Sequence, residues 1–507
     1  MALALPAAAQ SPLSAIDWLS RNLDQPPVAA APADPEPAEE SRGATSALTS
    51  DTITVTPLDA PTVDALGLLP AERAGLPRDL WGAAPSAGLA ERLARLTPDT
   101  LPALQQLTLR LLLAELDPPG DAEGRGALFL ARIDRLAAYG ALDQALSLVE
   151  AAGPADSPAL FARWFDLALL AGDVAPACTA LRSAPDLAAE HPLAPAARVY
   201  CLARGSAWDE ADRLFAEVEA GLPEAERSAL ARFLDPEADH APPPELPGGR
   251  APPSALLWHL LDTLGEAPPT ATLPLAFAHA DLGPTAGWKA RLEAAERLTR
   301  AGALTPNRLL GLYTERAPAA SGGVWERVRV VQQLEAALLA EDGARIADVL
   351  PPAWARMVEA ELEVAFAELY AERLLRLDLP AEAAALAFRA GLLTAAAPEI
   401  AQRGPATGRD GFAATIAADR LTADSPHPSG AMAEAIALGL TAPPGSAPRQ
   451  ADLSRGERLL EALTLLQAGG SEDARAVAEA LALLRTAGQP KVARAVAVQI
   501  LLLDRRG

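Results

Sequence analysis

The amino-acid sequence predicts an all-α protein built from many short helices. Half of the 507 residues are apolar, but only 4% are aromatic. The apolar residues are mostly Ala and Leu, which are strong helix formers. The chain also contains 47 Pro and 35 Gly, residue types that end helices more readily than they continue them. We therefore expect numerous helices joined by tight turns, arranged in roughly two or three domains.

The chain begins with a segment typical of the end of a secretory signal peptide. Residues 1–9 are apolar, and Ala7, Ala8 and Ala9 match the small residues that precede a cleavage site, although no basic residue comes before them. Two interpretations remain open. In the first, residues 1–9 are the remnant of a truncated signal peptide, the true start codon lies upstream and the protein is periplasmic. In the second, the start is an ordinary Ala-rich segment and the protein is cytoplasmic.

Residues 10–24 predict an amphipathic helix that is separate from the helices that follow. Its large apolar residues recur at helical spacing on or near one face, which could dock to a partner or to the protein's own body: Leu13, Ile16, Trp18, Leu19 and Leu23. Residues 25–50 are rich in Pro, Ala and acidic residues, a composition typical of a disordered linker. Residues 51–85 combine a β-prone alternation with helix breakers, and we expect an extended segment that packs on the helical body.

From residue 86 onward the pattern predicts helices with two interruptions. In chain order we expect an N-terminal helical repeat domain at 86–235, a Pro-rich linker at 236–254, a second helical domain at 255–402, an irregular loop at 403–430 and C-terminal helical hairpins at 431–507. The helical body is therefore expected to divide near residues 240 and 415.

An internal period is the strongest structural signal in the chain. Gly140, Gly172 and Gly205 are spaced by 32 and 33 residues, each between two helix-like segments. A small residue follows each glycine after five or six positions: Ala145, Ala177 and Ala211. Glycine lets the chain reverse tightly between helices, and a small alanine lets two helices approach closely. Periods in this range are typical of solenoids made of helical hairpins.

The third of these units resembles the tetratricopeptide repeat. The turn glycine, small alanine, aromatic residue and closing proline of that family's second helix correspond to Gly205, Ala211, Phe215 and Pro223. The first helices depart from the family, because they carry large residues where it has a small one: Ile133, Phe165 and Val199. The resemblance covers residues 127–223, with weaker echoes in the C-terminal half. It implies an α-solenoid of tetratricopeptide-like helical hairpins, preceded by the disordered N-terminal extension, that acts by binding other proteins.

Charge and hydropathy argue against a nucleic-acid partner and against a membrane span. The formal net charge is −23, whereas binding to nucleic acid requires a clustered positive field. No stretch approaches the 18 or so consecutive apolar residues that read as a membrane span. We therefore expect neither a nucleic-acid partner nor a membrane span.

The sequence contains no recognisable catalytic, cofactor-binding or metal-binding motif. None of its five histidines falls in a spaced ligand pair such as H-E-x-x-H: His191, His240, His259, His279 and His427. His259 lies in an apolar helical segment, where we expect a hydrogen-bonded core histidine. The glycines of residues 404–411 lack the Lys-Ser/Thr ending of a phosphate-binding loop, and we interpret this segment as a plain loop.

Cys178 and Cys201 are the only two cysteines. They fall in neighbouring helices of successive predicted hairpins, at similar distances from the intervening turn. A disulfide that joins the two hairpins is one interpretation, which an oxidising compartment would allow. Two buried free thiols that act as small apolar side chains are the other.

These observations together predict a non-enzymatic scaffold or adaptor that binds protein partners, in the bacterial periplasm and in the service of an envelope assembly. The first alternative is a cytoplasmic tetratricopeptide-like adaptor. The second is an enzyme that acts on cell-wall polymer and uses the solenoid as a frame.

Overall fold

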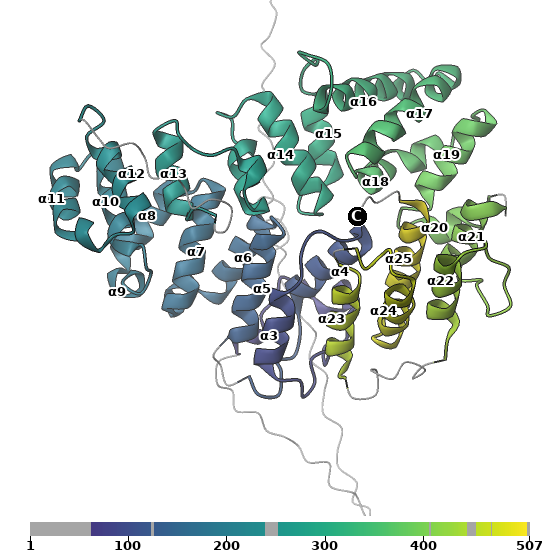
Figure 1. Cartoon of the computed structure of the whole chain (residues 1–507), viewed down its shortest axis with the longest axis horizontal. Helices are drawn as coiled ribbons and strands as arrows, with labels where there is room; N and C mark the ends of the chain where they lie inside the picture. The colour runs from purple at the N-terminus through teal and green to yellow at the C-terminus, as the bar shows by residue number, and fades with distance from the viewer. Residues whose placement is uncertain are drawn as a thin grey trace, which may run out of the picture. The chain divides into compact units, whose positions relative to one another are not determined.

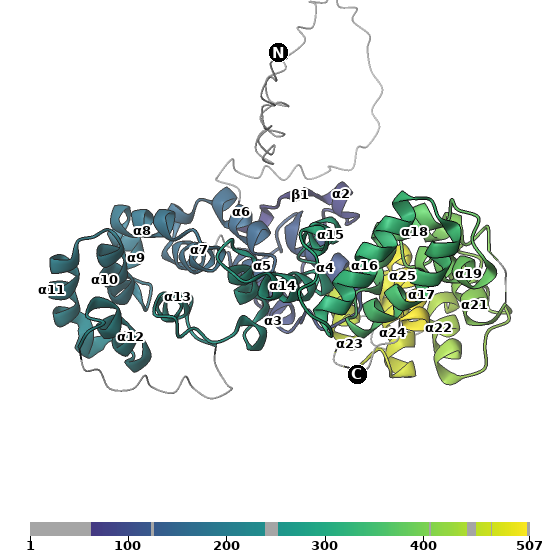
Figure 2. The same ribbon diagram turned by 90° about the horizontal axis from the view of Figure 1, so that it is seen from above.

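The computed structural model describes residues 62–122, 126–238, 252–404, 407–443, 453–467 and 469–503, which Figures 1 and 2 show from two directions. The expected signal remnant, amphipathic helix and linker lie outside the described residues, and so does the β-prone alternation at 52–56. The predicted docking residues Leu13, Ile16, Trp18, Leu19 and Leu23 lie outside the described residues as well. Among the described residues the fold is all-α apart from one two-residue pair of strands.

The first half of the described chain alternates helices with short turns. Its elements are η1 (Val63–Ala65), β1 (Leu69–Pro70), α2 (Ala71–Ala74), α3 (Ser86–Ala94), α4 (Pro102–Leu113), β2 (Ala114–Glu115), α5 (Ala127–Ala138), α6 (Leu142–Ala152), η2 (Pro154–Asp156), α7 (Pro158–Ala171), α8 (Val174–Ser183), α9 (Pro185–Ala188), α10 (Ala194–Arg204), α11 (Trp208–Val218), η3 (Glu219–Gly221) and α12 (Glu224–Leu234).

The second half continues in the same style. Its elements are α13 (Ala255–Thr263), η4 (Thr270–Thr272), η5 (Leu275–Leu282), α14 (Trp288–Arg300), α15 (Pro306–Thr314), α16 (Val324–Leu339), α17 (Gly343–Glu359), α18 (Glu363–Leu374), α19 (Ala381–Gly391), α20 (Ala397–Ile400), α21 (Gly408–Ala417), α22 (Ala431–Thr441), α23 (Arg455–Leu465), α24 (Ala474–Thr486) and α25 (Pro490–Leu502).

Two of the three glycines of the sequence period end helices in left-handed turns. Gly140 and Gly172 have φ angles of 73° and 89°, and the residue after each donates its N–H to a carbonyl five positions back, which closes a Schellman motif. In the third unit Gly205 has a φ of −80°, and Ser206, with a φ of 65°, takes the left-handed position instead. The extra residue of that unit therefore shifts the turn by one position.

With this shift, the small residue of each unit lies five positions after the left-handed one. The three alanines are fully buried: Ala145, Ala177 and Ala211, each with an exposed fraction of 0%. A side chain larger than a methyl group would hold the neighbouring helices apart at these points. The small alanine thus allows close helix packing in all three units. In the third unit the five positions are counted from Ser206 rather than from Gly205.

The segment before α3 packs on the helical body. Leu80 and Trp81 are 1% and 2% exposed. β1 pairs in parallel with β2, with Leu69 opposite Ala114. The buried Arg132 of α5 holds this region in place by donating hydrogen bonds to four carbonyl oxygens, those of Leu112 (2.8 Å), Leu66 (2.7 Å), Ala114 (2.9 Å) and Asp64 (3.4 Å). Burial lowers the pKa of Arg132 to about 10, so its guanidinium still carries its charge at neutral pH.

The helices do not divide where the sequence suggested. One hydrophobic core contains residues between 161 and 261, on both sides of the expected linker at 236–254, and Ser254 Oγ donates to Glu226 Oε1 across it at 3.0 Å. The expected irregular loop at 403–430 contains α21, whose Phe412 and Ile416 are 3% and 0% exposed. Its glycines suggested a loop, but the buried apolar residues pack against α25 and stabilise a helix.

The largest difference from the fold that the sequence predicted is that the beginning and the end of the described chain share a hydrophobic core. This core combines apolar residues from 71–167 with others from 364–503, together with Ala276. In Figures 1 and 2 the early helices α3 and α4 lie beside the late helices α23 and α25, and the same pairs are in contact. In an open solenoid each repeat contacts only its neighbours. Here contacts join residues that are several hundred positions apart.

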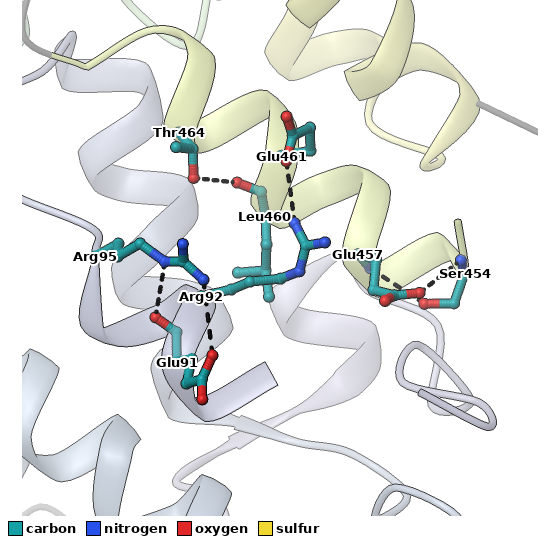
Figure 3. Close-up of polar contacts among 8 residues, drawn as sticks. All are labelled: Glu91, Arg92, Arg95, Ser454, Glu457, Leu460, Glu461 and Thr464. Atoms are coloured by element: carbon teal, nitrogen blue, oxygen red, sulfur yellow. Dashed lines mark hydrogen bonds and ion pairs between the residues drawn. The ribbon is translucent and has the colours of Figure 1, made fainter. Parts of the chain in front are cut away.

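Polar contacts line this junction, which we call the terminal seam and define as the contact of residues 75–104 with residues 453–503. Arg92 of α3 forms an ion pair of 3.0 Å with Glu461 of α23 (Figure 3). On the same helix, Ser454 and Glu457 form a capping box. Gly456 N–H donates to Leu80 O at 2.9 Å, and Gln489 Nε2 donates to Gly75 O at 2.8 Å.

Candidate functional site

Two adjoining hollows lie where the terminal seam meets the middle of the chain. They have volumes of about 380 and 220 Å³ and share three lining residues, Gln105, Arg300 and Glu361. We call the two together the seam site. The first is also lined by Pro98, Asp99, Thr100, Leu101, Leu275, Arg297, Ala301, Leu466, Gly469, Ser471 and Glu472. The second is also lined by Pro102, Gln106, Thr299, Gly302, Leu304, Thr305, Pro306, Leu362, Val364, Ala365 and Glu368.

Five separate parts of the chain position these side chains. They are the start of α4, the start of η5, the end of α14 with the turn that follows it, α18 with the turn before it, and the loop between α23 and α24. Left-handed turns shape three of the five, through Gly302 (φ 75°), Glu361 (φ 57°) and Gly469 (φ 84°). Because Glu361 is not a glycine, its backbone is in a conformation that side chains usually avoid.

Gln105 is the buried polar residue common to both hollows. It is 4% exposed, and its Nε2 donates to Pro98 O at 2.7 Å. This bond ties the first turn of α4 to the segment before it. Thr299 of α14 lines the second hollow and is 7% exposed, and its Oγ1 has no hydrogen-bond partner among the described residues. A buried hydroxyl without a partner costs free energy, so Thr299 marks a place where a ligand group could be accommodated.

The two arginines of the site are engaged by the protein itself. Arg297 donates to the carbonyl oxygens of Thr270 (2.8 Å) and Leu273 (2.9 Å). Arg300 donates from Nε to Ala360 O at 2.9 Å and lies 3.7 Å from Glu361 Oε2. Burial, with the neighbouring charge of Arg300, lowers the pKa of Arg297, although a guanidinium remains protonated at neutral pH.

Carboxylates outnumber the arginines around the site, and three of them have no cationic partner within 4 Å among the described residues: Asp99, Glu368 and Glu472. Asp99 and Glu472 are exposed. Glu368 is exposed at the surface, but the protein atoms around its carboxyl partly desolvate it and raise its pKa. Its Oε1 accepts a hydrogen bond from Gln106 Nε2 at 3.2 Å. The seam site therefore presents negative charge that the surrounding protein does not neutralise.

The histidines that the sequence singled out stabilise turns and helix ends in the structure. His259 hydrogen-bonds to the carbonyl oxygen of Leu169, and His279 Nε2 donates to Gly140 O at 2.6 Å. His191 contacts Asp166 at 3.2 Å through Nε2 and accepts the backbone N–H of Leu193 at Nδ1. His427 is exposed, and His240 lies outside the described residues. Within the described ranges, no group of three or more His, Cys, Asp or Glu residues could hold a metal ion.

The two cysteines form a disulfide in the structure. Cys178 of α8 and Cys201 of α10 have Cα atoms 5.3 Å apart, and their exposed fractions are 6% and 3%. They belong to the core that packs the second and third hairpins together. Of the remaining repeat-signature residues, Phe215 is half-buried, and Pro223 precedes the first residue of α12.

Sequence reasoning did not identify the residues of the seam site. Gln105, Arg297, Arg300, Glu361 and Glu368 belong to no motif, and each is an ordinary residue of a helix or turn. The site exists because the beginning, middle and end of the chain pack together, and no local pattern encodes that packing.

None of the helices in the described ranges combines the length with the apolar character that a membrane crossing requires. Comparisons with protein-family models, curated proteins and solved structures returned no match to this chain.

Proposed function

We propose that this chain is a non-enzymatic scaffold or adaptor that binds a segment of a partner protein at the seam site. We further propose that it works in the bacterial periplasm, as part of an envelope assembly. The observation that carries the proposal is the seam site itself: an open hollow with an unpartnered buried hydroxyl, that of Thr299, and carboxylates without cations. Such groups favour a bound ligand, because the ligand can supply the missing partners.

The finer description of the fold as a tetratricopeptide-like α-solenoid is part of this proposal. It is supported by the recurring turn at Gly140, Gly172 and Ser206, each followed five residues later by a fully buried alanine. The same arrangement recurs at Gly488, which has a φ of 86° and precedes the buried Ala493 by five residues. Helical repeats of this kind bind partners along extended surfaces.

The proposed location is supported by the pairing of Cys178 with Cys201. Structural disulfides persist in oxidising compartments such as the periplasm and are rare in the cytoplasm. The alternative is a cytoplasmic adaptor in which the two thiols are reduced. Intact-mass measurement of the native protein, after alkylation in denaturant with and without reductant, separates the two locations.

Site-specific photo-crosslinking tests the proposed binding site. A photoreactive residue replaces Thr305, which is exposed and lines the second hollow. The matched control replaces Thr179, which is exposed on α8. We expect a discrete protein adduct from position 305 in native cells and none from position 179. An absence of adducts at 305, or equal adducts at both positions, would contradict the proposal.

An enzyme that acts on cell-wall polymer is the alternative that one observation favours. The raised pKa of Glu368, which lines a hollow, is a property that general acids share. Against it, Glu368 is exposed, and its hydrogen-bond partner is the amide of Gln106. Release of soluble fragments from purified cell-wall polymer by the native protein, but not by Glu368→Gln, would favour the enzyme over the scaffold.

A further inference from the structure

The uncompensated charge of the seam site indicates the chemistry of its ligand. Glu472 lines the first hollow and Glu368 the second, and no cation of the described residues lies within 4 Å of either. The chain as a whole carries a formal charge of −23, so the surrounding field adds to that of the site. An approaching cation is therefore attracted over a distance and then finds partners at short range.

The arginines of the site are not free to attract an anion instead. Arg297 has two carbonyl acceptors, those of Thr270 and Leu273, and Arg300 has the carbonyl of Ala360 and the carboxylate of Glu361. An anion would have to displace these bonds and would also meet the neighbouring carboxylates. The two arginines therefore line the site without offering free donors to an anion.

The remaining lining indicates a polypeptide rather than a small amine. Apolar side chains from three parts of the chain, those of Leu101, Leu275 and Leu466, line the first hollow beside the charges. In the second hollow the nine-tenths buried Thr299 leaves its hydroxyl without a partner, beside the buried amide of Gln105. A mixture of apolar, hydrogen-bonding and acidic groups matches a peptide backbone that carries both apolar and basic side chains.

We infer that the seam site binds an extended polypeptide segment through a Lys or Arg side chain, which pairs with Glu368 or Glu472 while neighbouring apolar residues of the segment contact the leucines. This inference rests on the proposed function and names the chemical class of its partner. The basic side chain supplies the charge that the site lacks.

A binding measurement with defined peptides tests the inference on the full-length protein. The probe is a fluorescent blocked hexapeptide, Ala-Leu-Arg-Ala-Arg-Ala, and the matched probe carries citrulline, the uncharged isostere, in place of each arginine. We expect the arginine peptide to bind at least threefold more tightly than the citrulline peptide. The variant Glu368→Gln with Glu472→Gln is expected to weaken its binding at least threefold. The control Glu382→Gln, which neutralises an exposed carboxylate on α19, is expected to leave it unchanged.

The other outcomes would overturn the inference. It fails if the two peptides bind equally or if neither binds. It also fails if the double variant and the control have equal effects on binding, or if spermidine at the same concentration of positive charge displaces the arginine peptide completely. Far-UV circular dichroism of each variant confirms that it is folded. If position 305 crosslinks to a partner segment that carries no basic residue, the inference fails while the scaffold function stands. If position 305 yields no adduct, the scaffold function itself fails.

Discussion

The backbone N–H of Ala103 donates a hydrogen bond of 2.9 Å to Oε1 of Gln499, although 396 residues separate the two along the chain. Ala103 lies in the first turn of α4, where backbone N–H groups have no partner within their own helix. Both residues are buried, with exposed fractions of 7% and 5%. The last helix of the described chain thus caps one of its first, next to the residues that line the seam site.

Replacing Gln499 by Ala is expected to destabilise the protein by about 1–3 kcal/mol, because it leaves the buried N–H of Ala103 without an acceptor. The measurement is the free energy of unfolding from urea denaturation. The matched control is Gln402→Ala, since Gln402 is exposed and should cost less than about 0.5 kcal/mol. Equal losses in both variants would contradict the described packing of α4 against α25.

Replacing Gly456 by Ala is expected to destabilise by about 1–3 kcal/mol through overpacking at the terminal seam. An added Cβ would lie 2.7 Å from Trp81 Cε3 and 2.9 Å from Leu80 O. The control is Gly311→Ala in α15, where nothing lies within 4 Å of the added Cβ. That change should stabilise by about 0.5–1 kcal/mol, because alanine has the higher helix propensity. Thermal unfolding of both variants gives the comparison, and the same sign for both would argue against the contact.

Replacing Ser206 by Gly is expected to stabilise by about 0.5–1 kcal/mol, because Ser206 holds a positive φ that glycine adopts without steric cost. The complementary change Gly172→Ala should destabilise by about 1 kcal/mol, since Gly172 has a φ of 89°. Urea denaturation measures both. If Ser206→Gly loses stability instead, Ser206 is not the left-handed residue of the third unit.

Replacing Cys178 and Cys201 together by Ala is expected to lower the free energy of unfolding by about 2–4 kcal/mol, because the bond closes a loop in the unfolded chain. The two cysteines are 23 positions apart and buried. In the exported protein we expect no alkylation in denaturant without reductant, and two alkylated thiols after reduction. Two free thiols before reduction would remove both the disulfide and the support for the periplasmic location.

Acid is expected to destabilise the protein through two partly buried histidines, His259 and His279. Burial lowers the pKa of His259 and of His279, opposed in part by their hydrogen bonds to carbonyls and by Asp262 and Asp143. Arg204 and Arg308 lower them further. The folded protein disfavours the protonated form of both rings, whereas the unfolded chain protonates them below about pH 6.5. Stability is therefore fully present above that pH and is lost as the pH falls through the folded-state values.

The double variant His259→Gln with His279→Gln tests whether these two histidines cause the loss of stability in acid. Its free energy of unfolding should depend less on pH than that of the native protein between about pH 6.5 and 5, whatever its stability at pH 8. Unfolding measured in urea at each pH gives the slope. An unchanged slope would show that other groups cause the acid sensitivity.

The sequence predicted the local structure well, because local structure follows from local patterns. The all-α class and the turns at Gly140 and Gly172 come from residues that act within a few positions of each other. The segment at 403–430 was expected to be irregular because its glycines suggested turns, yet buried Phe412 and Ile416 stabilise α21. Propensity is a weak guide where tertiary packing decides.

The seam site could not have been predicted in the same way. Its charged residues, such as Arg300, Glu361 and Glu368, look like solvated side chains of ordinary helices and turns. They meet because α4 packs between the middle and the end of the chain, a relationship that no period or motif encodes. The expected divisions near residues 240 and 415 failed for the same reason, since cores cross both positions.

Amide hydrogen exchange at Ala103 tests the closure of the terminal seam most directly. The first-turn N–H groups of a helix ordinarily exchange fast, so protection at Ala103 depends on its bond to Gln499. Exchange can be followed by mass spectrometry at residue resolution. We predict that Ala103 is protected in the native protein and exchanges rapidly in Gln499→Ala, while the interior of α4 stays protected in both. Rapid exchange at Ala103 in the native protein would contradict the seam and the site that it forms.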